Sequence, residues 1–119
     1  MKPGKTGITR MIHALGYAFK GLQSGWRHEA AFRQEVLGMV VLVPAAFYVG
    51  DSGLEIALLL ATCVLVLIVE ILNSAIEAVV DRIGHEHHDL SGRAKDLGAA
   101  AVLLSLIALG VTWTLVVFY

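Results

Sequence analysis

The chain has 119 residues, 57% of them hydrophobic, and a formal net charge of −1. Because soluble domains are usually about 45–50% apolar, this composition argues against a soluble globular protein. The length leaves room for one domain only, over residues 1–119, and the near-neutral charge gives no indication of nucleic-acid binding.

The first element that the sequence predicts is an amphipathic helix over residues 6–29. Large apolar residues recur there at steps of one, three or four, mostly along one face, and basic and polar residues are interleaved with them. Such a helix would be stabilised by lying in the membrane interface with its basic residues toward anionic headgroups. The apolar residues are Ile8, Met11, Ile12, Leu15, Phe19, Leu22 and Trp26.

Three membrane helices follow, and we predict them at residues 30–49, 52–82 and 97–119. The second follows a tight turn at residues 50–53, and about 20 residues at 1.5 Å each cross the ~30 Å hydrocarbon core. This arithmetic places Glu70 at the inner edge of the core. Residues 84–96 read as a polar loop, and the third span has no charged residue. The predicted fold class is an all-α membrane protein with three transmembrane helices and an N-terminal amphipathic surface helix.

The basic residues indicate the orientation of the chain. All nine Lys and Arg residues lie either before residues 36–49, the uncharged core of the first span, or within residues 82–95, and the turn between the first two spans has none. Cytoplasmic loops carry the excess of Lys and Arg. We therefore expect a cytoplasmic N-terminus and a periplasmic C-terminus.

A stripe of polar residues follows the apolar run of the second span and consists of Glu70, Asn73, Glu77 and Asp81. At about 100° per residue, the four lie on one face of a helix. A carboxylate in or beside a bilayer is costly unless it has a partner or faces water, so the stripe is a candidate functional site. The alternative is that its acids only pair with basic residues of neighbouring helices. For Asp81 we expect such a pairing, with a basic residue of the polar loop.

Carboxylates at the cytoplasmic boundary would meet both a lipid headgroup and a soluble co-substrate. One would take a proton from a hydroxyl group, and another would hold a cation such as Mg²⁺, which prefers oxygen ligands and often bridges to phosphates. Glu29 would supply a second carboxylate, and Arg10, Arg93 and Lys95 are candidate phosphate partners. These groups suit phosphoryl transfer, in which positioning and charge neutralisation do most of the catalysis.

Three segments closely resemble the small integral-membrane diacylglycerol kinases of bacteria. They are EAAFRQE at residues 29–35, VEILNSAIEAVVDR at residues 69–82 and LSGRAKD at residues 90–96. The resemblance covers essentially the whole chain and includes the Gly-Tyr pair at residues 16–17. The central motif is highly specific, because a chance match over its fourteen positions is not credible.

The resemblance implies a homotrimer that makes phosphatidic acid from diacylglycerol and MgATP at the inner membrane, in active sites shared between neighbouring subunits. It implies that Glu70 is the general base, that Asn73 is an active-site amide, and that Glu29 and Glu77 bind Mg²⁺. The nucleotide-binding residues that it implies are Arg10, Tyr17, Glu29, Glu77, Glu86, His87, His88, Lys95 and Asp96. The substrate-binding residues that it implies are Arg10, Ala14, Phe19, Ala31, Phe32, Arg33, Gln34, Glu35, Glu70 and Trp113.

Two positions depart from the pattern of this family. Ala99 stands where a serine is expected, so any hydrogen bond from that hydroxyl group is absent. His87 stands where an aromatic residue such as tyrosine is expected, and its ring can still stack or hydrogen-bond there.

Two other functions are open to a chain of this kind. The first is an undecaprenol kinase, from a sister family of the same architecture that differs only in the alcohol; the segment at residues 29–35 favours diacylglycerol. The second is a non-enzymatic oligomeric channel or transporter subunit, because acids in a membrane also mark ion pathways. A pathway acid is expected near the midplane with polar residues along the span, whereas residues 56–69 offer only Thr62 and Cys63.

Overall fold

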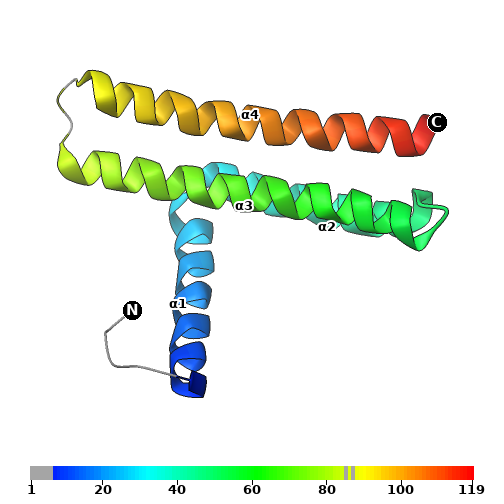
Figure 1. Ribbon diagram of the computed structural model, residues 1–119, viewed down its shortest axis with the longest axis horizontal. Coiled ribbons are helices and arrows are strands. Elements are labelled where there is room, and N and C mark those ends of the chain that lie inside the picture. The colour runs from blue at the N-terminus through cyan, green and yellow to red at the C-terminus, as the bar shows by residue number, and fades with distance from the viewer. Residues whose placement is uncertain (1–6, 85, 87) are drawn as a thin grey trace.

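The computed structural model describes residues 7–84, 86 and 88–119. Its elements are four helices, α1 (Gly7–His28), α2 (Ala30–Val49), α3 (Gly53–Ile83) and α4 (Asp89–Phe118). Three of them, α2, α3 and α4, are long and apolar enough to cross a membrane. They run side by side, and α1 projects from them at a steep angle (Figure 1). The prediction of an all-helical chain with three long apolar helices is confirmed.

The α2–α3 turn is closed by hydrogen bonds that the sequence encodes. Ser52 is the N-cap of α3, and its hydroxyl oxygen accepts from the backbone N–H of Glu55 at 3.2 Å. The Glu55 carboxylate accepts in return from the backbone N–H of Asp51 at 3.0 Å. This exchange satisfies donors that the first turn of a helix leaves without intrahelical partners. A side chain at Gly50 would lie 2.6 Å from Cγ1 of Ile56, so the turn needs a glycine there.

α4 begins earlier than the third membrane helix that the sequence predicts. The polar residues from Asp89 to Asp96 are the first turns of this helix rather than part of a loop. His88 is the N-cap, and its Nδ1 accepts from the backbone N–H of Leu90 at 3.1 Å. The difference has a simple cause, because loss of hydropathy marks where a bilayer would end, whereas caps and backbone hydrogen bonds decide where a helix ends.

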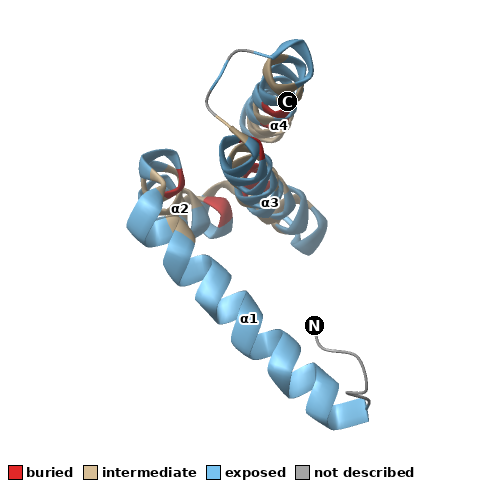
Figure 2. Ribbon diagram, turned by 90° about the vertical axis from the view of Figure 1, so that its left-hand side faces the viewer, coloured by how far each residue is buried: buried red, intermediate tan, exposed pale blue. Residues whose placement is uncertain are grey.

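α3 is the central helix, and one stripe of its residues forms the core. It packs against α4 on one side and α2 on the other (Figures 1 and 2). Leu59, Cys63 and Val66 are fully buried, and Glu70 continues the same stripe with 5% exposure. Steps of four and three residues keep these positions on one face of the helix. The stripe that is apolar in the first half of α3 thus becomes the polar stripe in the second half.

Among the residues that the structure describes, α1 contacts the other helices near its C-terminal end. None of its residues is buried (Figure 2). Its junction with α2 is held by Arg33, whose Nη1 donates to the backbone carbonyls of Trp26 at 2.7 Å and Arg27 at 3.2 Å. The ring of Phe32 is buried beside Gly25, where an added Cβ would lie 3.2 Å from it. These contacts fix the angle at which α1 leaves α2.

Candidate functional site

Four carboxylates converge on the middle of α3. Glu70 is buried, and it interacts electrostatically with Glu35 of α2, Glu77 of α3 and Glu29, the residue between α1 and α2. Like charges so close together repel one another, and burial removes the water that would screen them. A cation or a proton beside Glu70 would relieve this repulsion. The structure therefore brings together the proposed base, the two proposed metal ligands and one proposed lipid contact.

Asn73 lies between Glu70 and Glu77 along α3 and contacts the second of them. The side-chain Nδ2 of Asn73 donates a long hydrogen bond of 3.4 Å to Oε1 of Glu77. The carbonyl oxygen of the same amide is buried, as is the hydroxyl group of the next residue, Ser74. Within the described part of the chain, neither oxygen has a hydrogen-bond partner. The site thus holds polar groups that are desolvated and only partly satisfied, a state typical of functional sites.

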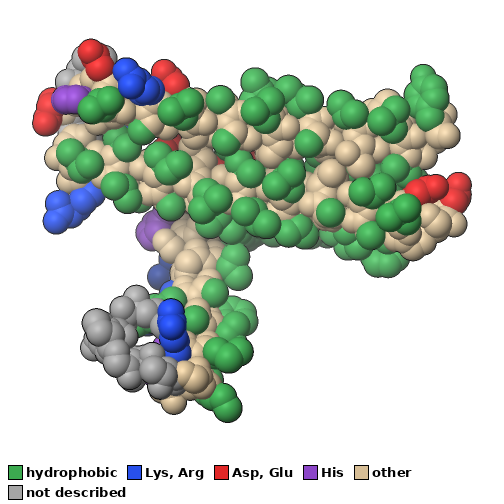
Figure 3. All heavy atoms as spheres, viewed as in Figure 1, with side chains coloured by type: hydrophobic (Ala, Val, Ile, Leu, Met, Phe, Trp, Pro, Cys, Tyr) green, Lys and Arg blue, Asp and Glu red, His purple; other side chains and the backbone are tan. Residues whose placement is uncertain are grey.

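The ends of α3 and α4 that meet at the charged side of the molecule carry a second group of residues. Nζ of Lys95 forms an ion pair of 2.9 Å with Oδ1 of Asp81, which confirms the expectation that Asp81 has a basic partner. A hollow of about 200 Å³ lies beside this pair and is lined in part by Glu86, His88 and Ser91. Figure 3 shows side chains of both charges gathered at this end, hydrophobic ones along most of α3 and α4, and acidic ones at the opposite end, beside the α2–α3 turn. Three of the predicted nucleotide-binding residues, Glu86, His88 and Lys95, are therefore neighbours.

Two further hollows adjoin the carboxylate cluster. One, of about 250 Å³, lies between α2, α3 and α4 and has Gln34 and Glu35 in its lining. The rest of the lining is apolar and consists of Gly38, Met39, Leu42, Val66, Leu106 and Leu109. The other, of about 220 Å³, lies where α1, α2 and α3 meet, and its lining includes Glu29, Phe32 and Ser74. Each joins an acidic mouth to an apolar wall, which is the shape that an amphiphile with a polar head requires.

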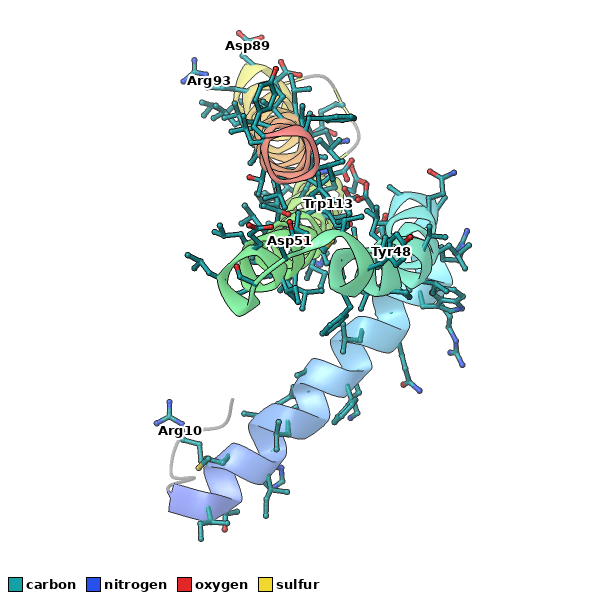
Figure 4. The ribbon with its side chains drawn as sticks, turned by 90° about the vertical axis from the view of Figure 1, so that its right-hand side faces the viewer. Arg10, Tyr48, Asp51, Asp89, Arg93 and Trp113 are labelled. Carbon is teal, nitrogen blue, oxygen red and sulfur yellow. The ribbon has the colours of Figure 1, made fainter. Side chains whose placement is uncertain are left out.

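The predicted site residues of α1 are not part of this cluster. Arg10, Ala14, Tyr17 and Phe19 are exposed on a helix that leads away from it, and Arg10 lies near the far end (Figure 4). The ring of Tyr17 has Lys20 of the same helix above it, with Nζ 5.8 Å from the ring centre. Within one chain, these residues do not meet Glu70.

The remaining predicted site residues lie in different parts of the molecule. Arg33 uses its guanidinium group at the α1–α2 junction, and Ala31 and Asp96 are exposed. The indole N–H of Trp113 is buried and lies beside the thiol of Cys63 in α3. His87 lies outside the described residues.

The sequence did not reveal two residues next to Asn73. Ser74 adjoins it in α3, and Gly98 of α4 lies directly against its side chain. Ser74 could have been found as a neighbour in the polar stripe. A contact between two helices, however, leaves no periodic signal in either of them.

A magnesium ion requires oxygen ligands, and carboxylates near Glu70 offer them. Over the ranges that the structure describes, no group of three His, Cys, Asp or Glu residues is placed to hold a metal ion. Glu29 and Glu77 offer two carboxylates, and both are near enough to interact with Glu70. Mg²⁺ usually takes one or two carboxylates and completes its shell with water and substrate phosphates. The residues therefore fit an ion that arrives with a phosphate ligand.

Comparisons with known proteins agree on one family. A family model described as prokaryotic diacylglycerol kinase matches residues 16–117. The diacylglycerol kinase of Escherichia coli K12 is 51% identical over 118 residues, which cover 99% of this chain and 97% of that protein. The diacylglycerol kinase of Pseudomonas aeruginosa is 53% identical over 110 residues (92% and 89%), and that of Haemophilus influenzae is 44% identical over 114 residues (96% and 97%).

Proposed function

Because the chain belongs to the prokaryotic diacylglycerol kinase family and is therefore a membrane kinase for diacylglycerol, we propose that it transfers the γ-phosphoryl group of MgATP to the lipid hydroxyl with Glu70 as the general base. The reaction is proposed at the cytoplasmic face of the inner membrane. The observation that carries this proposal is the burial of Glu70 among Glu29, Glu35 and Glu77, at the point where the buried stripe of α3 turns from apolar to polar.

In the proposed reaction, the Glu70 carboxylate accepts the proton of the diacylglycerol hydroxyl. The oxygen then bonds to the γ-phosphorus, the bond from that phosphorus to the bridging oxygen breaks, and ADP leaves. Lys95 is the group that would neutralise phosphate charge from the start of α4. When bound with ATP, Mg²⁺ supplies further charge neutralisation, and Glu29 and Glu77 are the residues that would hold it.

The lipid is proposed to enter along the hollow that begins at Gln34 and Glu35. Its wall is apolar and lies between α2, α3 and α4, so an acyl chain would be buried there while the glycerol end stays at the acidic mouth. The same mouth contains a carboxylate that interacts with Glu70. This arrangement would bring the free hydroxyl group to the base.

α1 is proposed to lie in the cytoplasmic membrane interface, with the N-terminus inside and the C-terminus in the periplasm. Its large apolar side chains are mostly exposed, with Ile8 at 76% and Phe19 at 67%, and the described part of the chain does not cover them. Basic residues between them would face anionic headgroups.

The assembly is proposed to be a homotrimer in which α1 of one subunit completes the site of another. The support is the distance between the α1 residues and the carboxylate cluster in a single chain (Figure 4). Mixing two inactive chains, Arg10→Ala and Glu70→Gln, is expected to restore about a quarter of wild-type activity, because about that share of randomly mixed sites would have both residues intact. Activity no higher than that of the separate variants would contradict shared sites.

The proposed acceptor is tested by transfer of radiolabelled phosphate from MgATP in mixed micelles. Diacylglycerol is compared with a C55 prenol, since undecaprenol kinase is the second candidate. Faster phosphorylation of diacylglycerol is expected, and equal or faster phosphorylation of the prenol would reverse the assignment. A channel or transporter subunit without catalysis has no support from a family whose members are named kinases.

The pair of Asp81 and Lys95 separates a structural role from a nucleotide-binding role. The two side chains are 48% and 44% exposed, so Asp81→Asn is expected to change the free energy of unfolding by less than about 1 kcal/mol. Lys95→Met is expected to raise KM for ATP by about tenfold, since a charge-assisted hydrogen bond contributes about 1.5–3 kcal/mol. Initial rates over a range of ATP concentrations measure this effect. Equal damage from both variants would show that Lys95 matters only through Asp81.

A further inference from the structure

Gly98 of α4 and Asn73 of α3 meet at the interface between the two helices. Gly98 is buried, and a Cβ added there would clash with Oδ1 of Asn73. The next nearest atoms are also those of Asn73, its Cγ at 3.2 Å and its Cβ at 3.9 Å. The carboxamide of Asn73 therefore occupies the space that a side chain on Gly98 would need.

The direction of that carboxamide follows from its two neighbours. An ionised carboxylate accepts hydrogen bonds and cannot donate them. The amide therefore presents its NH₂ group to Glu77, at 3.4 Å. The carbonyl oxygen must then point toward α4, where it is buried beside Gly98 without a hydrogen-bond partner among the described residues. Only a residue without a Cβ leaves room for this arrangement.

We propose that Gly98 is a positioning residue for phosphoryl transfer, because its bare Cα holds the Asn73 amide against Glu77 and so fixes the direction of that carboxylate. The inference rests on the proposed function, in which Glu77 would bind the metal with ATP. Partners that orient a metal-binding side chain are known to affect affinity or activity strongly. The interior of a helix otherwise favours alanine over glycine, so helix propensity alone would not select a glycine here.

A spectroscopic experiment tests the contact directly. Asn73 is the only asparagine in the chain, so ¹⁵N-asparagine labelling gives a single side-chain NH₂ signal for the full chain in detergent micelles. In Gly98→Ala this signal is expected to shift, because an added Cβ displaces the carboxamide from its place against Glu77. Gly110→Ala is the matched control, because it also lies in α4 and an added Cβ there meets nothing within 4 Å. A signal in Gly98→Ala that coincides with the wild-type signal would overturn the inference.

A kinetic cycle shows whether Gly98 acts through Asn73. Gly98→Ala is expected to lower kcat/KM for MgATP by about 10- to 100-fold, and Gly110→Ala to leave it unchanged. In an Asn73→Ala background the same change is expected to cost about twofold or less, because the clashing atoms are gone. The double variant also removes the obstacle to folding. Equal losses in both backgrounds, or a double variant that fails to fold while Asn73→Ala folds, would overturn the inference.

Different results reject the role of Gly98 and the proposed function. An additive cycle rejects the role of Gly98 and leaves the proposed function standing. An inactive wild type, or a Glu77→Gln variant with unchanged Mg²⁺ dependence, rejects the proposed function and with it the purpose of orienting Glu77.

Discussion

Replacing Glu70 by glutamine is expected to lower kcat for diacylglycerol phosphorylation by about 100- to 10,000-fold, the range that general base catalysis usually supplies. The glutamine side chain has nearly the same shape but cannot accept the proton. KM for both substrates is expected to change much less, because the variant keeps the volume and the apolar neighbours of the original residue. Steady-state rates in mixed micelles, measured at several concentrations of each substrate, separate the two parameters.

Glu55 provides the matched control for this variant. It lies in the first turn of the same helix, far from Glu70 along the chain, and its carboxylate accepts from the backbone N–H of Asp51. Glutamine can make the same hydrogen bond, so Glu55→Gln is expected to keep both fold and activity. A Glu70→Gln enzyme within tenfold of wild type would reject Glu70 as the base.

The second large effect is expected for Glu77→Gln in its dependence on magnesium. Unit charges about 4 Å apart attract by about 4 kcal/mol at an effective dielectric constant of about 20, and about 1.4 kcal/mol is already tenfold in affinity. Removing the Glu77 charge is therefore expected to raise the Mg²⁺ concentration for half-maximal rate by about tenfold or more. Glutamine can still accept from Asn73, so the variant tests the charge rather than the hydrogen bond.

The other carboxylates of the cluster make this test specific. Glu29→Gln is expected to shift the Mg²⁺ titration in the same direction, because Glu29 is the second proposed ligand. Glu35→Gln is expected to leave the Mg²⁺ titration in place, since Glu35 is proposed to face the lipid. If all three variants gave the same shift, the effect would reflect the total charge of the cluster, and Glu77 would lose its assignment as a ligand.

The sequence predicted the membrane helices from long apolar runs and the polar stripe from helical periodicity. Long apolar runs indicate membrane helices directly, and spacing by three and four residues places Glu70, Asn73 and Glu77 on one face whatever surrounds them. The same reasoning gave Asp81 a basic partner, found in Lys95. The start of α4 at Asp89 was missed because hydropathy does not register where a helix is capped.

The sequence did not predict the angles and contacts between helices. The turn away from α2 that α1 makes depends on Glu29, which is a single extended residue with φ −118° and ψ 104°. Its identity gives no sign of that conformation. The contact between Asn73 and Gly98 joins residues that lie on separate helices, far apart in the sequence. Neither helix carries a mark of it, so only the packed structure could reveal the contact.

The buried stripe of α3 changes from the apolar Val66 to the carboxylate of Glu70 within about one turn, a rise of about 6 Å at 1.5 Å per residue. In a membrane, a rigid helix would hold that boundary at one depth, so the lipid would have to bring its hydroxyl group to the proposed base. Alcohols whose hydroxyl groups lie at a different depth in the bilayer would not reach Glu70, whatever side chains line the site. The thickness of the surrounding membrane then becomes part of substrate recognition.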